Sequence, residues 1–308
     1  MNRCEPPALP TGVPGAGEEF SPAVPAGVGF NVPPQAWFLV SAVFHYLGPA
    51  FAVLLFPAVG VLGVAWFRIS SAALVFAPIT RPARLLARIE RRERLLLVGM
   101  GACLALMNCS FYLALARLPI SLVAAIEFVG TIGLALYGMR TPRNRVALSM
   151  AVAGVFVLIN VRWSTDPVGL GWAFANGVLF VLYIVLGHRI ARGGAGRGIE
   201  RLGAAMAVAF VAVFPVGIMQ AARAFSHPML VLAGVGVGIC SSVIPYVCDQ
   251  LAMARLSRAS FALMLTLLPA SATIIGAIVL GQVPGPREMS GIALVMAAMA
   301  LHRPAETV

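Results

Sequence analysis

One stretch in the first half of the chain decides the fold. Residues 95–139 read LLLVGMGACLALMNCSFYLALARLPISLVAAIEFVGTIGLALYGM, and their only charged residues are Arg117 and Glu127. Arg117 separates two apolar runs, 95–116 and 121–139, and each is long enough to cross the ~30 Å hydrocarbon core of a bilayer as an α-helix. Because the apolar residues are continuous and do not alternate with polar ones, helices are favoured over the strands of a barrel. The stretch therefore predicts two consecutive transmembrane helices.

Apolar runs of this kind fill the rest of the chain. Hydrophobic residues make up 60% of the 308 positions and charged residues only 11%, with a mean hydropathy of +0.93. A soluble domain has far more polar surface in proportion. We therefore predict an all-α integral membrane protein with ten transmembrane helices, at 37–57, 60–79, 95–116, 121–139, 146–161, 169–187, 202–222, 229–253, 259–281 and 288–302.

The arginines orient these helices. The chain has 22 arginines, no lysine and 11 acidic residues, which gives a net charge of +11. With a cytoplasmic N-terminus, seventeen arginines fall in cytoplasmic segments, four in outward loops and one, Arg68, within a predicted helix. Cytoplasmic loops of membrane proteins carry such an excess of positive charge. We therefore predict a multi-pass inner-membrane protein with both termini in the cytoplasm. The basic stretch 81–94 is expected to be a loop at the lipid headgroups, with no nucleic-acid partner.

The composition also disfavours several kinds of chemistry. Without lysine there is no Walker A phosphate loop and no Schiff-base lysine, which argues against a self-contained ATP-driven pump. The four histidines are far apart, and four of the five cysteines lie inside apolar runs, so we expect no metal site and no cofactor. An intramembrane enzyme would need clustered carboxylates or a His/Asp/Ser constellation, which the predicted helices lack. No catalytic residues are expected.

A short internal repeat divides the chain into halves. Ala114-Leu-Ala-Arg-Leu118 is matched 138 positions later by Ala252-Met-Ala-Arg-Leu256. Because five predicted helices separate the two copies, the copies have opposite orientations across the membrane, as in the inverted repeats of secondary transporters. The expected organisation is a Pro/Gly-rich cytoplasmic tail at 1–36, a first five-helix repeat at 37–161, an outward loop at 162–168, a second five-helix repeat at 169–302 and a cytoplasmic tail at 303–308.

The same register aligns interruptions in the two halves. Met107-Asn108 corresponds to Pro245-Tyr246, and Gly130-Thr131 corresponds to Leu268-Pro269. Proline and glycine within a span free or expose backbone groups that another helix or a substrate can satisfy. Helix-packing kinks would explain each interruption separately, whereas their matched positions favour a cavity between the halves.

Several residues and motifs of the predicted helices form a recognisable set: Met107-Asn108, Phe111-Tyr112, Ala125-Ile-Glu127-Phe-Val-Gly130, Ile244-Pro-Tyr-Val-Cys-Asp249, Ala252-Met-Ala-Arg-Leu256, Arg68, Tyr183 and Leu280-Gly281. With this set the sequence resembles the threonine/homoserine exporter branch of the drug/metabolite transporter superfamily, whose halves are EamA-type domains. The resemblance covers nearly everything from Trp37 to His302. It implies a secondary-active exporter of a small polar metabolite, above all an amino acid such as threonine or homoserine. Members often carry a Glu before the span-nine proline and a Gly-Glu closing that span. This chain has Leu268 and Gly281-Gln282 there, which leaves the substrate and the route of proton coupling open.

Three polar residues are expected at one depth on three helices. At 1.5 Å per residue, Arg68 lies roughly 10 to 12 Å, Glu127 roughly 9 Å and Asn108 roughly 10 Å below the outward membrane surface. A charge at such a depth is costly and needs a partner. In one interpretation Arg68 and Glu127 neutralise each other until a zwitterionic amino acid separates them, so that exchange changes the protonation of Glu127 and couples export to protons. In the other they form a permanent structural ion pair.

Four further residues are candidates for substrate binding or coupling. Asp249 would act as a gating group on the inward side, or would lie at the interface beside Arg255 and Arg258. Tyr246 and Tyr183 would supply cavity hydroxyls, or would be ordinary interfacial or core tyrosines. His45 would relay protons, or would be a hydrogen-bonded packing residue.

The sequence thus predicts a membrane transporter that works by proton-coupled alternating access, with a small-molecule substrate, protons and membrane lipid as partners. It is compatible with a homodimer. A transporter of another metabolite or drug class is the alternative. A non-catalytic membrane subunit or an intramembrane enzyme is the alternative from a different class.

Overall fold

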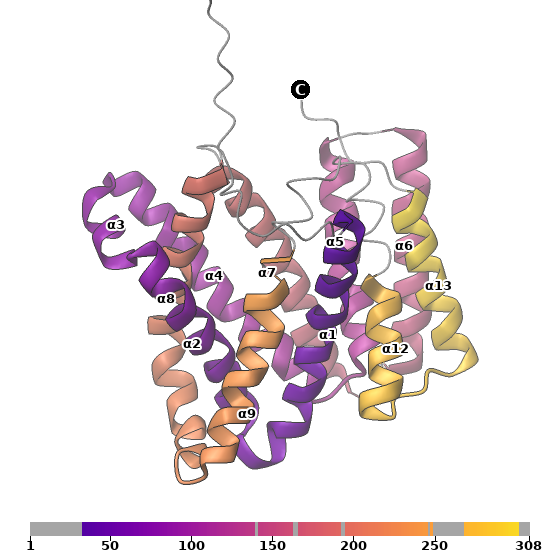
Figure 1. Cartoon of the computed structure of the whole chain (residues 1–308). Coiled ribbons are helices and arrows are strands. Elements are labelled where there is room, and N and C mark those ends of the chain that lie inside the picture. Colours follow the sequence, from indigo (N-terminus) through magenta and orange to yellow (C-terminus); the bar gives the residue numbers. More distant parts are fainter. Residues whose placement is uncertain are drawn as a thin grey trace, which may run out of the picture. The chain divides into compact units, whose positions relative to one another are not determined.

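The fold was obtained as a computed structural model, which describes residues 33–138, 141–162, 166–191, 195–245, 247–248 and 268–301. The chain divides into two units, 1–32 and 33–308, and all the described residues belong to the second. These residues form helices and connections, with no strand among them (Figure 1). The helices are α1 (Pro34–Val59), α2 (Val61–Thr80), α3 (Pro82–Arg88), α4 (Arg91–Leu115), α5 (Ile120–Gly138), α6 (Pro142–Arg162), α7 (Pro167–Ala191), α8 (Ala195–Ala221), η1 (Ala222–Ala224), α9 (Pro228–Gly238), the π-helical turn η2 (Ile239–Val243), α12 (Leu268–Leu280) and α13 (Pro286–Leu301).

Many of these helices are suited to a lipid environment. Five are long and apolar enough to cross a membrane, namely Gln35–Val59, Val61–Thr80, Arg91–Leu115, Pro167–Leu186 and Glu200–Ala224. Large apolar side chains such as Leu74, Ile79 and Ile278 are exposed on the helix surfaces, as expected where lipid replaces water. The helical structure and the apolar spans therefore confirm the prediction of an all-helical membrane protein. The predicted span 229–253 is described as far as residue 248, and 259–281 from residue 268 onwards.

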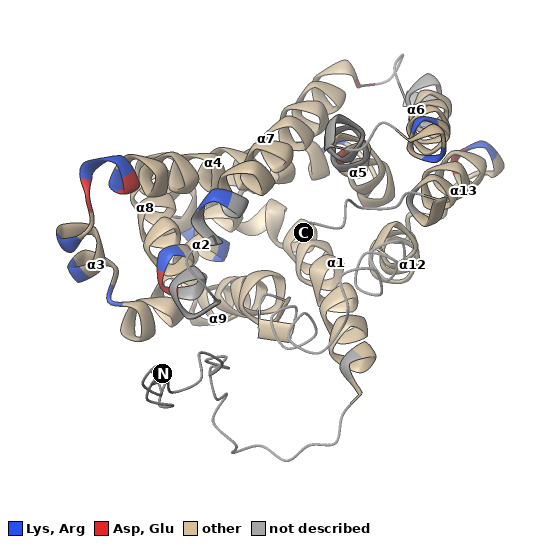
Figure 2. Ribbon diagram, turned by 90° about the horizontal axis from the view of Figure 1, so that it is seen from above, with Lys and Arg blue, Asp and Glu red and all other residues tan. Residues whose placement is uncertain are grey.

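The basic stretch 81–94 is not the loop that the sequence predicted. Pro82 begins the short helix α3, because proline suits the first turn of a helix, where its missing N–H is not needed. Leu85, Leu86 and Ile89 then pack against the apolar cluster that α2, α4 and α8 build. The arginines between these residues stay exposed, so the stretch is an amphipathic surface helix followed by the first turn of α4. Figure 2 shows these basic residues on α3 and at the start of α4.

Helices from the two predicted repeats pack closely against each other. α2 lies along α8 over most of its length, and glycines permit the approach at both ends. A Cβ atom added to Gly203 would lie 2.2 Å from Thr80 Oγ1, and one added to Gly217 would lie 2.5 Å from Trp66 Cβ. Small residues bring membrane helices together in this way. α6 packs similarly against α13, so helices distant in sequence build one compact unit.

Two glutamines fasten the ends of helices that belong to different halves. Gln220, near the end of α8, accepts hydrogen bonds from the first amides of α2 through Oε1, from Leu62 N at 2.9 Å and Gly63 N at 3.2 Å. Gln282, just after α12, accepts a hydrogen bond from Ile120 N at the start of α5, at 3.1 Å. The first amides of a helix have no partner within the helix, and these side chains satisfy them.

Candidate functional site

Arg68 lies inside the bundle, on α2, where it faces η2 and α4. Its Nε donates a hydrogen bond to Ser242 Oγ and its Nη2 donates one to the backbone carbonyl of Ser241, both at 3.2 Å. The guanidinium carbon also lies 5.7 Å from the ring centroid of Phe111 and 5.5 Å from that of Tyr112, within the range of cation–π attraction. Arg68 is therefore stabilised by neutral acceptors and by aromatic faces.

Glu127 lies on α5, buried among α1, α5 and α7. Glu127 is only 6% exposed, and its carboxyl interacts with the amide of Asn176 on α7, which is 1% exposed. Glu127 is also close enough to Arg68 and to the Tyr46 hydroxyl for electrostatic interaction through space.

The direct ion pair considered for Arg68 and Glu127 is not formed. No nitrogen of Arg68 lies within 4.0 Å of a Glu127 oxygen, and the salt bridges within the described residues are those of Arg117 with Asp166 and of Arg201 with Glu93. The reason is geometric: Ser241 and Ser242, 173 and 174 positions away along the chain, hold the guanidinium toward η2. The two charges thus share one interior without touching.

Several buried polar atoms in this interior have no hydrogen-bond partner within the described part of the chain. They are the hydroxyls of Tyr46 and Tyr112 and both polar atoms of the Asn176 amide. Tyr46 lies on α1 within electrostatic reach of Glu127, Tyr112 lies on α4 with its ring against Arg68, and Asn176 lies on α7 next to the Glu127 carboxyl. Leaving such a group unpaired costs about 1 to 3 kcal/mol, so native proteins rarely do it without a reason. A polar ligand would satisfy these atoms.

The other predicted site residues have different surroundings. Asn108 is buried on α4, but its Nδ2 donates to Leu104 O in the same helix at 2.8 Å, which stabilises the helix and does not require a ligand. Tyr183 stacks on Phe180 at 6.1 Å and packs against the cluster of α2, α4 and α8. His45 is half-buried, and its ring packs edge-on against that of Tyr46, with the ring centroids 5.3 Å apart. It also lies within electrostatic reach of Arg68. The roles proposed for these three residues stay predictions.

Tyr246 and Asp249 lie outside the described residues, as do the second copy of the repeat at 252–256 and the tail before residue 33. The predictions made for them stay as they were. In the part of the chain that is described, no three His, Cys, Asp or Glu side chains gather closely enough to hold a metal ion.

Five residues of the interior were absent from the predicted set, namely Tyr46, Tyr112, Asn176, Ser241 and Ser242. Asn176 carried a signal that could have been used, because it is an amide in the middle of an otherwise apolar run. Ser241-Ser242 carried a weaker one, since the pair precedes the helix-breaking Pro245 by one turn. Tyr112 belonged to the Phe111-Tyr112 motif that carries the family resemblance, whereas nothing local distinguishes Tyr46 from a core tyrosine.

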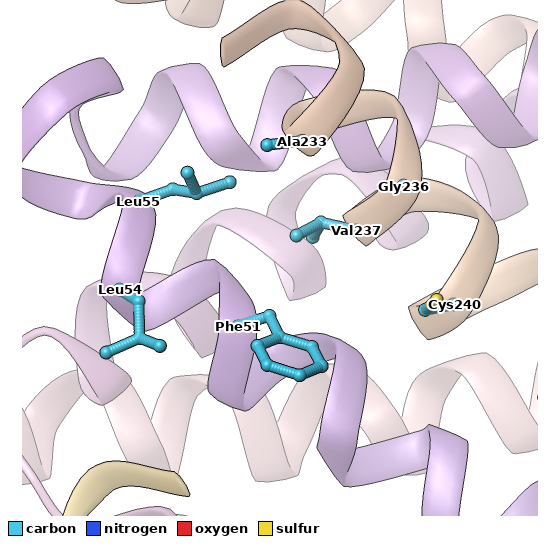
Figure 3. Close-up of a pocket in the computed structure, with 7 residues that line it drawn as sticks. All are labelled: Phe51, Leu54, Leu55, Ala233, Gly236, Val237 and Cys240. Atoms are coloured by element: carbon cyan, nitrogen blue, oxygen red, sulfur yellow. The ribbon is translucent and has the colours of Figure 1, made fainter. Parts of the chain in front are cut away.

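A separate apolar pocket of about 430 Å³ opens between α1 and α9 (Figure 3). Phe51, Leu54 and Leu55 of α1 line one side of it. Ala233, Gly236, Val237 and Cys240 line the other. No charged side chain reaches the pocket, and Phe51 and Leu54 are themselves exposed on the helix surface. It therefore lacks the groups that recognise a zwitterion, and the polar interior around Arg68 and Glu127 remains the candidate site.

The comparisons with known proteins identify the family. Residues 167–302 match the model of the EamA-like transporter family. The chain is 30% identical over 254 residues to the threonine/homoserine exporter RhtA of Escherichia coli (strain K12), covering 82% of this chain and 84% of the relative. The exporter of the same name from Salmonella typhimurium (strain LT2) is 30% identical over 256 residues, which is 82% of this chain and 85% of the relative.

A solved crystal structure shows a similar fold. It is 19% identical in sequence, covers 87% of this chain and 96% of its own chain, and superposes with a TM-score of 0.54. The apolar helices and these relatives establish a multi-pass membrane protein. The chain belongs to the EamA-type transporters of the drug/metabolite transporter superfamily, in the threonine/homoserine exporter branch.

Proposed function

We propose that this protein exports an amino acid such as threonine or homoserine by proton-coupled alternating access. One observation carries the proposal: Arg68 and Glu127 share an interior in which the polar atoms of Tyr46, Tyr112 and Asn176 are unpaired. A zwitterion matches such an interior, since its carboxylate suits Arg68 and its ammonium suits Glu127. The exporters to which the chain is similar are named for substrates of this class.

The carboxylate end of the substrate would bind Arg68. A guanidinium has five N–H donors, and the described contacts engage two of its nitrogens, Nε and Nη2. The remaining donors can form charge-assisted hydrogen bonds with a carboxylate, which are about twice as strong as neutral ones. The rings of Phe111 and Tyr112 keep the guanidinium in place while the substrate binds and leaves.

The ammonium end would bind Glu127, which provides the link to protons. A buried carboxylate without a direct cation is strongly disfavoured, so Glu127 carries a proton on one of its carboxyl oxygens or faces a cation. A substrate ammonium and a proton then exclude each other at this carboxyl. Exchange of one for the other on opposite sides of the membrane is the coupling that an exporter needs.

The proposal includes the arrangement in the membrane. Ten helices in two inverted five-helix repeats would alternate the access of the interior between the two sides of the inner membrane, with both termini in the cytoplasm. The distribution of arginines supports this orientation, because residues 81–94, between α2 and the first turn of α4, hold six arginines and residues 189–201, around the junction of α7 and α8, hold four.

The test uses the purified full-length protein in liposomes. With an acid interior, we expect labelled L-threonine to accumulate against its gradient in the wild type. Glu127→Gln should lose this accumulation and keep counterflow, since an amide can still accept a hydrogen bond from the ammonium but cannot exchange a proton. Glu93→Gln is the matched control, because Glu93 pairs with Arg201 where α4 and α8 begin. Wild-type accumulation by Glu127→Gln would overturn the coupling, and wild-type protein without counterflow of any amino acid would overturn the substrate class.

A further inference from the structure

The helix that holds Arg68 in place is interrupted one turn before a proline. α9 continues without a break into η2, where Ile244 N–H donates to Ile239 O, five residues back instead of four. Pro245 follows. In an α-helix residue 245 would donate its N–H to the carbonyl of Ser241, but proline has no N–H and its ring clashes with that carbonyl. π-helical turns frequently occur at functional sites.

Arg68 supplies a donor to the carbonyl that Pro245 leaves without its helical partner. Its Nη2 lies 3.2 Å from Ser241 O, and its Nε lies 3.2 Å from the hydroxyl of the next residue, Ser242. The Ser241 hydroxyl is engaged elsewhere, because it donates to Val237 O at 2.6 Å. The carbonyl of Ser241 and the hydroxyl of Ser242 thus form a holder for the guanidinium, that is, a pair of acceptors that bind two of its nitrogens.

Glycines on both sides keep this holder in position. A Cβ atom on Gly48 of α1 would lie 2.5 Å from the Cβ of Ser241, and one on Gly238 would lie 2.5 Å from the Cβ of Ser71 on α2. Contacts that short do not occur between real atoms, so only glycine permits α1 and α2 to enclose the turn this closely. Ser41 of α1 adds a hydrogen bond to Pro245 O at 3.4 Å.

We infer that Pro245 and Ser242 are positioning residues for the substrate carboxylate, acting through Arg68. Pro245 removes the N–H that the Ser241 carbonyl would accept in an α-helix, Ser242 provides the hydroxyl, and together they aim the guanidinium toward the interior. The donors of Arg68 that Ser241 and Ser242 do not engage are then the ones presented to the carboxylate. This inference rests on the proposed function only in its identification of the ligand as a carboxylate.

The first test measures how well the transporter recognises a carboxylate. Counterflow of L-threonine is compared with that of its primary amide, which keeps the ammonium and the hydroxyl but has no carboxylate. We expect Pro245→Ala and Ser242→Ala to reduce the preference for threonine about tenfold, through a higher KM and with little change in kcat, as befits loss of one charged hydrogen bond. Ser242→Thr should restore the preference to within about twofold, since threonine keeps the hydroxyl. Pro215→Ala in α8 is the matched control. It also removes a proline from a membrane helix, but lies far along the chain from the turn that holds Arg68.

The second test needs no substrate. The apparent Tm of the purified protein is measured for Arg68→Gln, Pro245→Ala and the double variant. Without Arg68, the Ser241 carbonyl has lost a donor that an alanine N–H at position 245 would replace. Pro245→Ala should therefore raise Tm more, or lower it less, in the Arg68→Gln background than in the wild type. Equal effects in both backgrounds, or an unchanged threonine preference in Pro245→Ala and Ser242→Ala, would overturn the inference. A wild type that carries no amino acid would overturn only the proposed substrate, because this second test would still decide the positioning role.

Discussion

The two charged residues of the interior, Arg68 and Glu127, differ in the partners that surround their side chains. Arg68 has hydrogen-bond acceptors on Ser241 and Ser242 and two aromatic rings beside it. Glu127 has an Asn176 amide and a Tyr46 hydroxyl nearby, whose polar atoms are unpaired. The guanidinium of Arg68 thus has partners without a ligand, although the hydroxyl of Tyr112 beside it is unpaired, whereas the polar groups around Glu127 lack partners. Under the proposed function, Arg68 would be a preformed anchor for the substrate, and binding and proton exchange would change the Glu127 side.

Of the substitutions that test this difference, replacing Arg68 should reduce transport the most. Arg68→Gln removes the charge that the anchor provides, and we expect transport of L-threonine at low concentration to fall about 100-fold, since truncating one partner of a buried charge pair costs several kcal/mol. Arg68→Lys keeps the charge but loses the planar fork, so an intermediate loss is expected. Initial rates of counterflow in liposomes would measure both. Arg84→Gln, an exposed arginine of α3, is the control and should transport normally. Normal rates in Arg68→Gln would show that the anchor does not bind substrate.

Changing Asn176 should separate stability from activity. Asn176→Leu removes two buried polar atoms that lack a geometric hydrogen-bond partner, together with the amide that interacts with Glu127, so we expect the protein to keep its stability or gain about 1 kcal/mol while transport falls at least tenfold. Thermal unfolding in detergent and counterflow would measure the two effects. Asn108→Leu is the comparison, because its amide already donates to Leu104 O and its removal should not stabilise the protein. A destabilised Asn176→Leu variant would show that the Glu127 side is complete without a ligand.

Tyr46→Phe should also reduce transport without destabilising the protein, but the changes should be smaller. It removes one unpaired hydroxyl and keeps the ring that packs against His45. We expect a stabilisation of about 1 kcal/mol and a transport rate reduced several-fold, with the pH dependence of transport altered because the hydroxyl lies beside Glu127. pH profiles of counterflow for the wild type and the variant would check this. An unaltered rate and profile would remove Tyr46 from the site.

Asp166 should give the smallest effect, because it lies outside the interior. The backbone amide of Gly169 donates to it at 2.8 Å and, together with Arg117, lowers its pKa below the ordinary value. A lowered pKa stabilises the folded protein at pH values above the ordinary aspartate range, and this contribution disappears as the pH falls through the lowered pKa. Asp166→Asn should therefore lower Tm slightly at neutral pH and not in acid, with transport unchanged. A large loss of transport would mean that the connection before α7 takes part in the cycle.

The sequence by itself determined where the helices are and which charges lie among them. Continuous apolar runs predicted the segments that became α1, α2, α4, α5 and α7, because burial in lipid requires local hydrophobicity that can be read one helix at a time. The same reasoning identified Arg68 and Glu127 as polar residues that need a partner. The family resemblance extended this to a transporter.

The tertiary structure decided which groups meet. Arg68 faces serines more than 170 positions away instead of Glu127, and packing brings Asn176 of α7 and Tyr46 of α1 to the region of Glu127. Helix α3 forms because Leu85 and Leu86 find an apolar surface built by three other helices, which its basic composition does not reveal. The physical reason is the same in each case: hydrophobicity and charge are properties of a segment, whereas a hydrogen bond or its absence depends on the distance and angle between helices that only packing sets.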